Sequence, residues 1–86
     1  MSKLLDCNVH DYFEIICMRK SRVTVTTKAG ENFSGEAHDI ALNSAKQELL
    51  MLKNTTAEIG ILLTEVARLH AHDNAIAQHN FLINIT

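Results

Sequence analysis

The chain has 86 residues, of which 47% are hydrophobic and 21% charged, and its formal net charge is −2. This length allows one domain with a thin core, and the composition argues against a disordered chain. The slight negative charge argues against direct nucleic-acid binding as the main activity, because phosphate recognition usually needs a basic excess. The sequence shows no signal peptide and no apolar run of membrane-spanning length, so we expect a cytoplasmic protein with no membrane contact.

Residues 8–18 have the apolar spacing of an amphipathic helix of about three turns. One helical face collects its apolar side chains, namely Val9, Phe13, Ile16 and Cys17. Cys7 and Cys17 would flank this helix about 15 Å apart along its axis, which is beyond disulfide reach. We therefore expect two reduced thiols that pack as small apolar groups.

The other side of the predicted helix carries its polar residues. Asn8 can cap the helix, and Asp11 then lies at the third helical position, a weak variant of the capping box. Capping and the helix dipole would be enough to explain Asp11. They explain Glu14 less well, because Glu14 lies beyond the first turn, and His10 lies beside both acids.

The period changes to two after residue 21, which predicts strands. Residues 22–27 alternate valine and threonine, and the turn over 28–31 contains Gly30 for a left-handed position. The alternation resumes at Asn32, with a bend expected at Gly35 and a bulge or strand end at 39–40. Three more strands are expected over 48–52, 57–63 and 81–85. The intervening segment 65–69 fits either a short helix or a last core strand, and loops are expected over 41–46 and 70–74.

A helix followed by five to six short antiparallel strands, one of them bent at a glycine, predicts a mainly β fold. We expect a small antiparallel β-barrel, because closing the sheet removes exposed edges that so short a chain must protect. The barrel would span about residues 22–86 of a single domain, 1–86, with the helix at about 8–18.

Candidate catalytic and metal-binding residues are few. His38 and Asp39 are adjacent and could form an acid–base pair, but no nucleophile elbow, activated cysteine or phosphate-binding glycine loop accompanies them. His70 and His72 would point the same way on a strand, as half of a metal site, but no second Cys/His pair has matching spacing. A solvated loop is the favoured interpretation, and we predict neither an enzyme nor a bound metal or cofactor.

A basic cluster supplies a second functional hypothesis. It consists of Arg19, Lys20 and Arg22, with Lys28 nearby. These side chains could bind phosphates. Equally, they could lie in a solvated segment after the helix, where positive charges complement the helix dipole. Residues 35–43 also resemble the glycine–aspartate–asparagine pattern of Sm-like RNA-binding proteins. The alternative is thus an Sm-like single-stranded RNA-binding module that uses this cluster and the Asp39/Asn43 loop, although no interleaved aromatic residues offer base stacking.

The segment from Cys7 to Cys17, with Asp11, Glu14 and the ten-residue cysteine spacing, resembles the opening of the Rof (YaeO) family of bacterial Rho-binding antiterminators. The resemblance continues in the same order over about residues 6–69, through the segments 23–25, 28–31, 37–40, 48–50 and 59–63. The family pattern has aspartates where Asn8 and Val9 stand and a tyrosine where His10 stands, so this chain keeps only part of the family's acidity.

The resemblance implies an Sm-like barrel with an N-terminal helix, and a protein partner, the transcription terminator Rho. It implies that the protein inhibits termination by binding the RNA-binding domain of Rho and blocking RNA loading. Carboxylates on a rigid helix can occupy a basic RNA cleft in place of phosphates. Asp11 and Glu14 are then the expected contacts, with His10 and Asn8 on the same face.

Overall fold

The computed structural model describes the backbone of residues 7–85 and the side chains of residues 10–85. Over these residues an α-helix precedes six strands, and short 3-10 helices lie before the last two. The elements are α1 (Cys7–Arg19), β1 (Arg22–Thr27), β2 (Asn32–Leu42), β3 (Glu48–Lys53), β4 (Glu58–Leu62), η1 (Leu63–Glu65), β5 (Val66–Ala71), η2 (Ala77–His79) and β6 (Phe81–Asn84).

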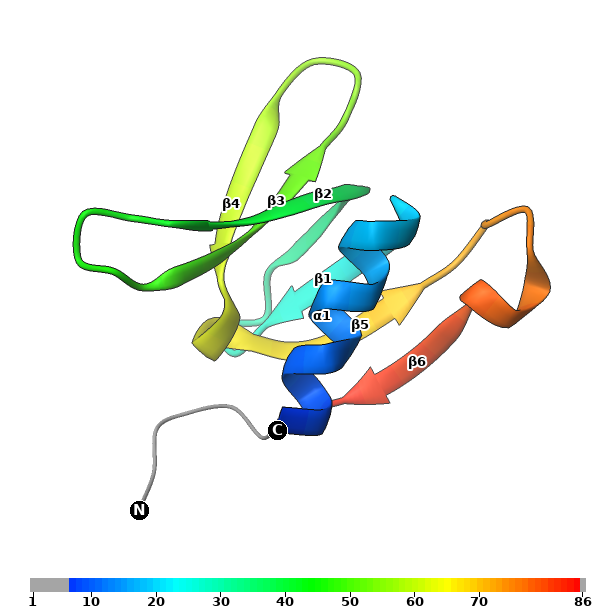
Figure 1. The fold of residues 1–86 in the computed structure, drawn as a ribbon, viewed down its shortest axis with the longest axis horizontal. Coiled ribbons are helices and arrows are strands. Elements are labelled where there is room, and N and C mark those ends of the chain that lie inside the picture. Colours follow the sequence, from blue (N-terminus) through cyan, green and yellow to red (C-terminus); the bar gives the residue numbers. More distant parts are fainter. Residues whose placement is uncertain (1–6, 86) are drawn as a thin grey trace.

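The six strands form one antiparallel sheet in the order β4-β3-β2-β1-β5-β6. Figure 1 shows α1 lying across one face of this sheet, in front of β1 and β5. The mainly β fold with an N-terminal helix is therefore as predicted. The closure of the sheet into a barrel is not confirmed, because β4 and β6 end the strand order and no pairing joins them within the described residues.

The helix explains how the open sheet still covers its core. Phe13 and Ile16 are fully buried and belong to the same apolar cluster as the strand residues. Burying one such side chain contributes roughly 1.5–3 kcal/mol. The ring of Tyr12 also lies 5.3 Å from the ring of Phe81 on β6. The helix thus gives the inner face apolar cover that a closed barrel would take from its own strands.

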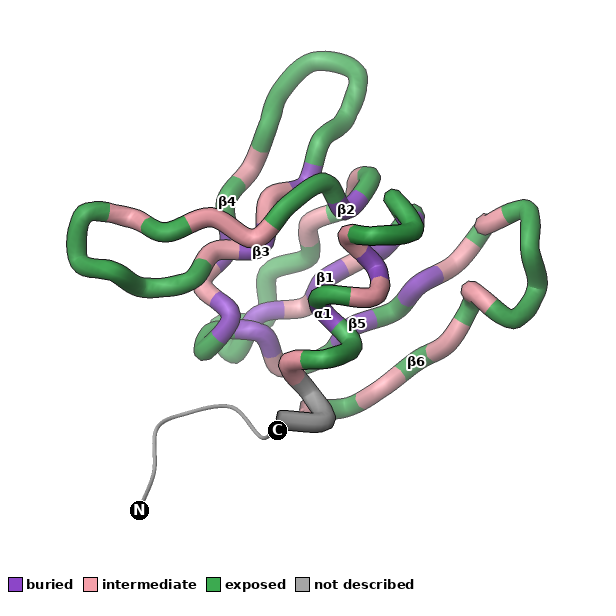
Figure 2. The backbone as a smooth tube through the Cα atoms, viewed as in Figure 1, coloured by how far each residue is buried: buried purple, intermediate pink, exposed green. Residues whose placement is uncertain are grey.

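The core follows the alternation expected of half-buried strands. On β1, Val23 and Val25 are buried, whereas Thr24 and Thr26 are only half-buried. Figure 2 shows the buried segments gathered in the centre of the molecule, around α1, β1 and β5, with exposed loops extending outward. The buried apolar residues are Phe13, Ile16, Val23, Val25, Ala37, Leu50, Leu52, Ile61, Leu63, Val66, Leu69 and Ala71.

Strand β2 is irregular, as its sequence predicts, and it is longer than predicted, because residues 41 and 42 were expected in a loop. Its register against β3 shifts between Ala37 and Asp39, which marks the expected bulge, but the strand continues to Leu42. A Cβ atom on Gly35 would lie 3.0 Å from the carbonyl oxygen of Lys53. Glycine is therefore needed where β2 passes close to β3. The turn before β2 places Gly30 at φ 88°, also as predicted.

Two local predictions are corrected. The ambiguous segment 65–69 is mostly strand, and β5 extends through His70 and Ala71, for which the sequence predicts a loop. Its partner β1 supplies the reason, because Val25 and Thr24 pair with Leu69 and His70 along the free edge of β1. The helix begins at Cys7, so position 8 lies inside it and is not the predicted cap.

Candidate functional site

Asp11 and Glu14 both lie exposed on α1. Because the helix begins at Cys7, its first turn holds no acidic residue, and Asp11 lies beyond that turn. The dipole of a helix acts mainly on its first turn, so capping no longer accounts for Asp11. Asn8, the other predicted contact on this helix, has a side chain outside the described residues. Both helical carboxylates are thus exposed, and helix capping explains neither of them.

His10 lies between two carboxylates from different elements. Its Nδ1 atom is 3.7 Å from Oε1 of Glu14, one helical turn away, and its Nε2 atom is 3.1 Å from Oε2 of Glu48. Glu48 is the first residue of β3. This half-buried imidazole therefore connects the helix to the sheet. No sequence pattern indicated Glu48 as a site residue, because 38 positions separate it from His10.

A fourth acid lies close to the helix. The pKa of the Cys17 thiol is raised to about 11, first by burial and then by the carboxylates of Asp39 and Glu14, with Lys20 acting in the opposite direction. Asp39 on β2 therefore lies near enough to the helix for its charge to be felt there. We call the set of Asp11, Glu14, Asp39 and Glu48 the acidic face.

Among the described side chains, no lysine or arginine lies within ion-pair distance of the acidic face. Over residues 10–85, every ion pair within 4.0 Å uses a histidine as its basic member. Pairs of this kind at a solvated surface contribute little to stability. The carboxylates therefore remain available to a basic partner.

The residues of the RNA-binding hypothesis are not brought together. Arg22 opens β1 and Lys28 follows its last residue, so roughly 20 Å of strand separates them. Asn43 lies at the start of the β2–β3 loop, where its Oδ1 atom accepts bonds from the backbone N–H groups of Ala45 and Gln47. That asparagine therefore shapes its own turn.

The histidine pairs do not form the sites considered from the sequence. The rings of His70 and His72 do lie on one side, 4.8 Å apart. However, Nδ1 of His72 is 2.8 Å from Asp73 and its Nε2 is 2.6 Å from the hydroxyl of Thr24. Residues 10–85 contain no group of three potential metal ligands. His38 is 4.0 Å from a carboxylate oxygen of Glu58 and, among the described contacts, forms no pair with its neighbour in the sequence.

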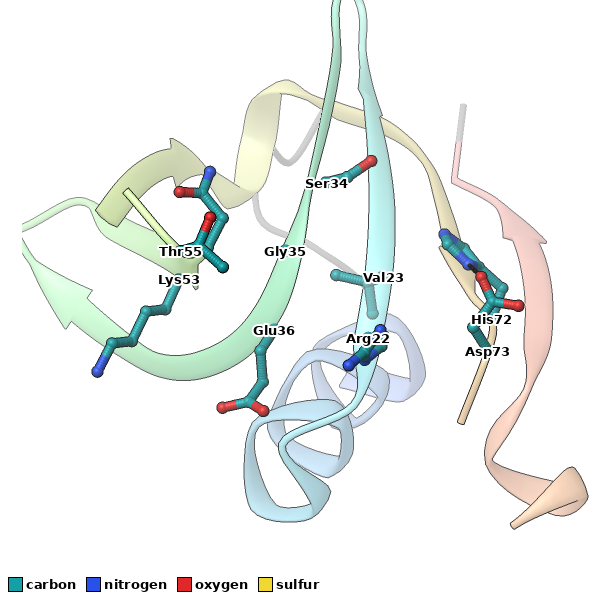
Figure 3. A pocket seen from close by; sticks show the side chains of 10 residues that line it. Arg22, Val23, Ser34, Gly35, Glu36, Lys53, Thr55, His72 and Asp73 are labelled. Atoms are coloured by element: carbon teal, nitrogen blue, oxygen red, sulfur yellow. Dashed lines mark hydrogen bonds and ion pairs between the residues drawn. The ribbon is translucent and has the colours of Figure 1, made fainter. Parts of the chain in front are cut away.

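The outward face of the sheet contains a pocket of about 510 Å³ that the sequence did not indicate. Figure 3 shows its side chains coming from β1, β2, the end of β3 with the turn after it, and the segment after β5. Arg22 and Lys53 contribute positive charge to it, and Glu36 and Asp73 negative charge. The pocket lies on the face of the sheet that does not carry α1.

The comparisons with known proteins cover most of the chain. A family model described as "Modulator of Rho-dependent transcription termination (ROF)" matches residues 4–80. The chain belongs to the ROF family. The match includes all of α1 and the five strands β1 to β5, so it covers the elements that carry the acidic face. The description names a regulator of termination and no catalytic activity.

A solved structure supports the same assignment for this ROF-family chain. "YaeO bound to Magnesium" from Vibrio cholerae O395 superimposes with a TM-score of 0.77 at 26% identity, covering 88% of this chain and 96% of that chain. A search of curated proteins gave no match. Within the described residues no helix is long and apolar enough to cross a membrane.

Proposed function

We propose that this protein inhibits Rho-dependent termination by binding Rho directly through the acidic face and thereby blocking the loading of RNA. The observation that carries the proposal is the pair of exposed carboxylates, Asp11 and Glu14, on a helix anchored by the buried side chains of Phe13 and Ile16. In this proposal the whole chain acts as one domain, in the cytoplasm, where Rho and its RNA are found.

The chemistry of the two surfaces is complementary. A site for single-stranded RNA is a groove of positive charge that follows the phosphates. Asp11 and Glu14 are three residues apart, so their Cβ atoms lie about 5–6 Å apart on one side of the helix. Because the helix is already docked on the sheet, little conformational entropy is lost when its carboxylates are bound. They can therefore replace RNA phosphates efficiently.

The sheet adds two carboxylates to those of the helix, from Asp39 on β2 and Glu48 on β3. Glu48 reaches His10, and His10 also approaches Glu14. These contacts restrain two carboxylates that would otherwise rotate freely. In the proposal, His10 is a positioning residue, and Glu48 and Asp39 extend the contact beyond the helix. The lost family acids at positions 8 and 9 are thereby partly replaced from β2 and β3.

A competition experiment tests the two parts of the proposal. Labelled single-stranded RNA bound to Rho should be released as this protein is added, and the competition should weaken as salt screens the charges. Binding to Rho without release of RNA would contradict the block of loading. A failure to bind Rho at low salt would contradict the direct interaction itself.

No metal enters this proposal. The similar structure is described as bound to magnesium, but the described residues of this chain gather no set of three potential ligands. In this proposal the carboxylates of the acidic face contact a protein partner.

A further inference from the structure

We propose that the pocket on the outward face of the sheet binds a nucleoside phosphate. It is lined by residues of β1 and β2, by the end of β3 and the turn that follows it, and by the segment that follows β5. Side chains alternate across a strand, so Arg22 and Thr24 point outward while Val23 and Val25 point into the core. This site is separate from the acidic face, which lies with α1 on the other side.

Two cations identify the anionic part of the ligand. Arg22 and Lys53 are exposed at the pocket, and no carboxylate of residues 10–85 lies within 4.0 Å of either charge. A phosphate between them would form charge-assisted hydrogen bonds, for which the guanidinium group is especially suited. The carboxylate of Asp73 is already engaged by His72 at 2.8 Å. Glu36 is left to accept a bond from a hydroxyl or amino group of the nucleoside.

A row of hydrogen-bonded side chains lies beside the pocket, and two of its members, Ser34 and His72, line it. The hydroxyl of Thr24 lies 2.6 Å from Nε2 of His72 and 2.9 Å from the hydroxyl of Ser34. The backbone N–H of Arg22 donates to Oδ1 of Asn74 at 2.7 Å, which fastens one wall to β1. The polar groups are therefore held in place before a ligand arrives, and this lowers the entropic cost of binding.

Histidine rings next to this row can hold the base. The exposed ring of His70 lies 4.8 Å from the ring of His72, at an angle of 51°. Histidine is among the side chains on which proteins stack unpaired bases. The volume of about 510 Å³ falls within the range of small-ligand sites. The pocket carries both positive and negative charges, which suits a single nucleotide better than a long RNA strand. The net charge of the chain, −2, also argues against binding a long strand.

The test is a titration of the isotope-labelled full chain, followed by NMR, with uridine 5′-monophosphate, inorganic phosphate and a six-nucleotide RNA. We expect shifts at the amides of Arg22, Ser34 and His72. The double variant Arg22→Gln/Lys53→Gln should lower nucleotide affinity at least about tenfold, because it removes two charge-assisted contacts. The matched control Lys28→Gln/Lys46→Gln, with the same loss of charge outside the pocket, should change it less than about twofold.

A second variant separates a nucleotide site from a general anion site. His70→Ala should weaken the binding of the nucleotide and leave inorganic phosphate unaffected. Equal affinity for mononucleotide and RNA would identify a free nucleotide as the ligand. At least tenfold tighter RNA binding, still dependent on Arg22 and Lys53, would identify a strand end or loop.

Three results would overturn the proposal. The first is that none of the three ligands shifts the amide signals at millimolar concentration. The others are an equal loss of nucleotide affinity in the double variant and its control, and inorganic phosphate binding as tightly as the nucleotide. The site is independent of the proposed Rho interface. Arg22→Gln/Lys53→Gln should retain full affinity for Rho, so the two proposals fail separately.

Discussion

The two faces of the sheet differ in the charge that they offer a partner. On the inner side, α1 covers the core and presents carboxylates with no lysine or arginine within ion-pair distance among the described residues. On the outer side, a pocket lined by hydroxyl and imidazole groups combines the positive charges of Arg22 and Lys53 with the negative charges of Glu36 and Asp73. The formal net charge of −2 describes the whole chain and does not reveal this difference between the two faces. The two faces of one small sheet can therefore bind different kinds of ligand.

The largest effect is expected from breaking the anchor of the acidic face. Phe13→Ala should cost about 3–5 kcal/mol of unfolding free energy, because it leaves a cavity where the helix meets the sheet. Urea unfolding followed by circular dichroism measures this loss. Leu82→Ala, at an exposed apolar position on β6, is the matched control and should change stability by less than about 0.5 kcal/mol. Similar losses in both variants would mean that the helix is not docked as described.

Reversing the helical charges should abolish the interaction with Rho while the outer face is untouched. Asp11→Lys/Glu14→Lys should weaken binding at least about 100-fold, because like charges then face each other across the interface. The control is Glu58→Lys/Glu65→Lys, with the same change of net charge on β4 and η1. Calorimetry with Rho, together with native circular dichroism spectra, decides the outcome. Unchanged binding of the first variant would remove the helix from the interface.

The outer face depends on the close approach of β2 and β3. Gly35→Ala places a Cβ 3.0 Å from the carbonyl oxygen of Lys53 and should cost about 1–3 kcal/mol, because backbone must shift. Gly60→Ala is the control, since its Cβ would meet the flexible side chain of Met51 at 3.2 Å. Thermal unfolding compares the two. A smaller loss for Gly35→Ala than for Gly60→Ala would contradict the close approach.

The pKa of the Cys17 thiol depends on the carboxylates of the acidic face, so the reactivity of this thiol can be used to detect them. Its pKa is raised from 9.0 to about 11, so folding favours the neutral thiol. The associated stability is fully present below pH 9 and is lost as the pH rises through 11. In a Cys7→Ser background, alkylation at about pH 8 should be slow and should accelerate as the pH rises toward the pKa, because only the thiolate reacts. Glu14→Gln and Asp39→Asn should each speed it, whereas Glu58→Gln should not.

The smallest effect concerns the contribution of the sheet to the acidic face. Glu48→Gln removes one carboxylate at the edge of the proposed interface and should weaken Rho binding about two- to fivefold, mainly through slower association. Glu58→Gln is the control, because Glu58 is also an exposed glutamate close to a histidine. Stopped-flow association rates at low and high salt distinguish them. Equal rates for the two variants would confine the interface to the helix.

Local pattern was enough to predict most elements of this chain. The alternation over 22–27 indicated the bounds of β1, and the apolar spacing of Phe13 and Ile16 indicated the buried face of α1. Gly30 marked the first turn, and the irregularity near Asp39 marked the bulge. Each of these features is set by neighbours within a few residues, through side-chain period or backbone freedom. The resemblance that pointed to the ROF family also rests on short segments in a fixed order.

Other features of the molecule depend on residues that are far apart in the sequence. Glu48 meets His10 across 38 positions, and Thr24 meets His72 across 48. The identity of residues 66–71 as a strand follows from the free edge of β1. The described strands leave the sheet open, and α1 lies across its inner face. Local periodicity determines which face of an element is apolar, but packing alone decides which elements meet, and both proposed sites lie where distant elements meet.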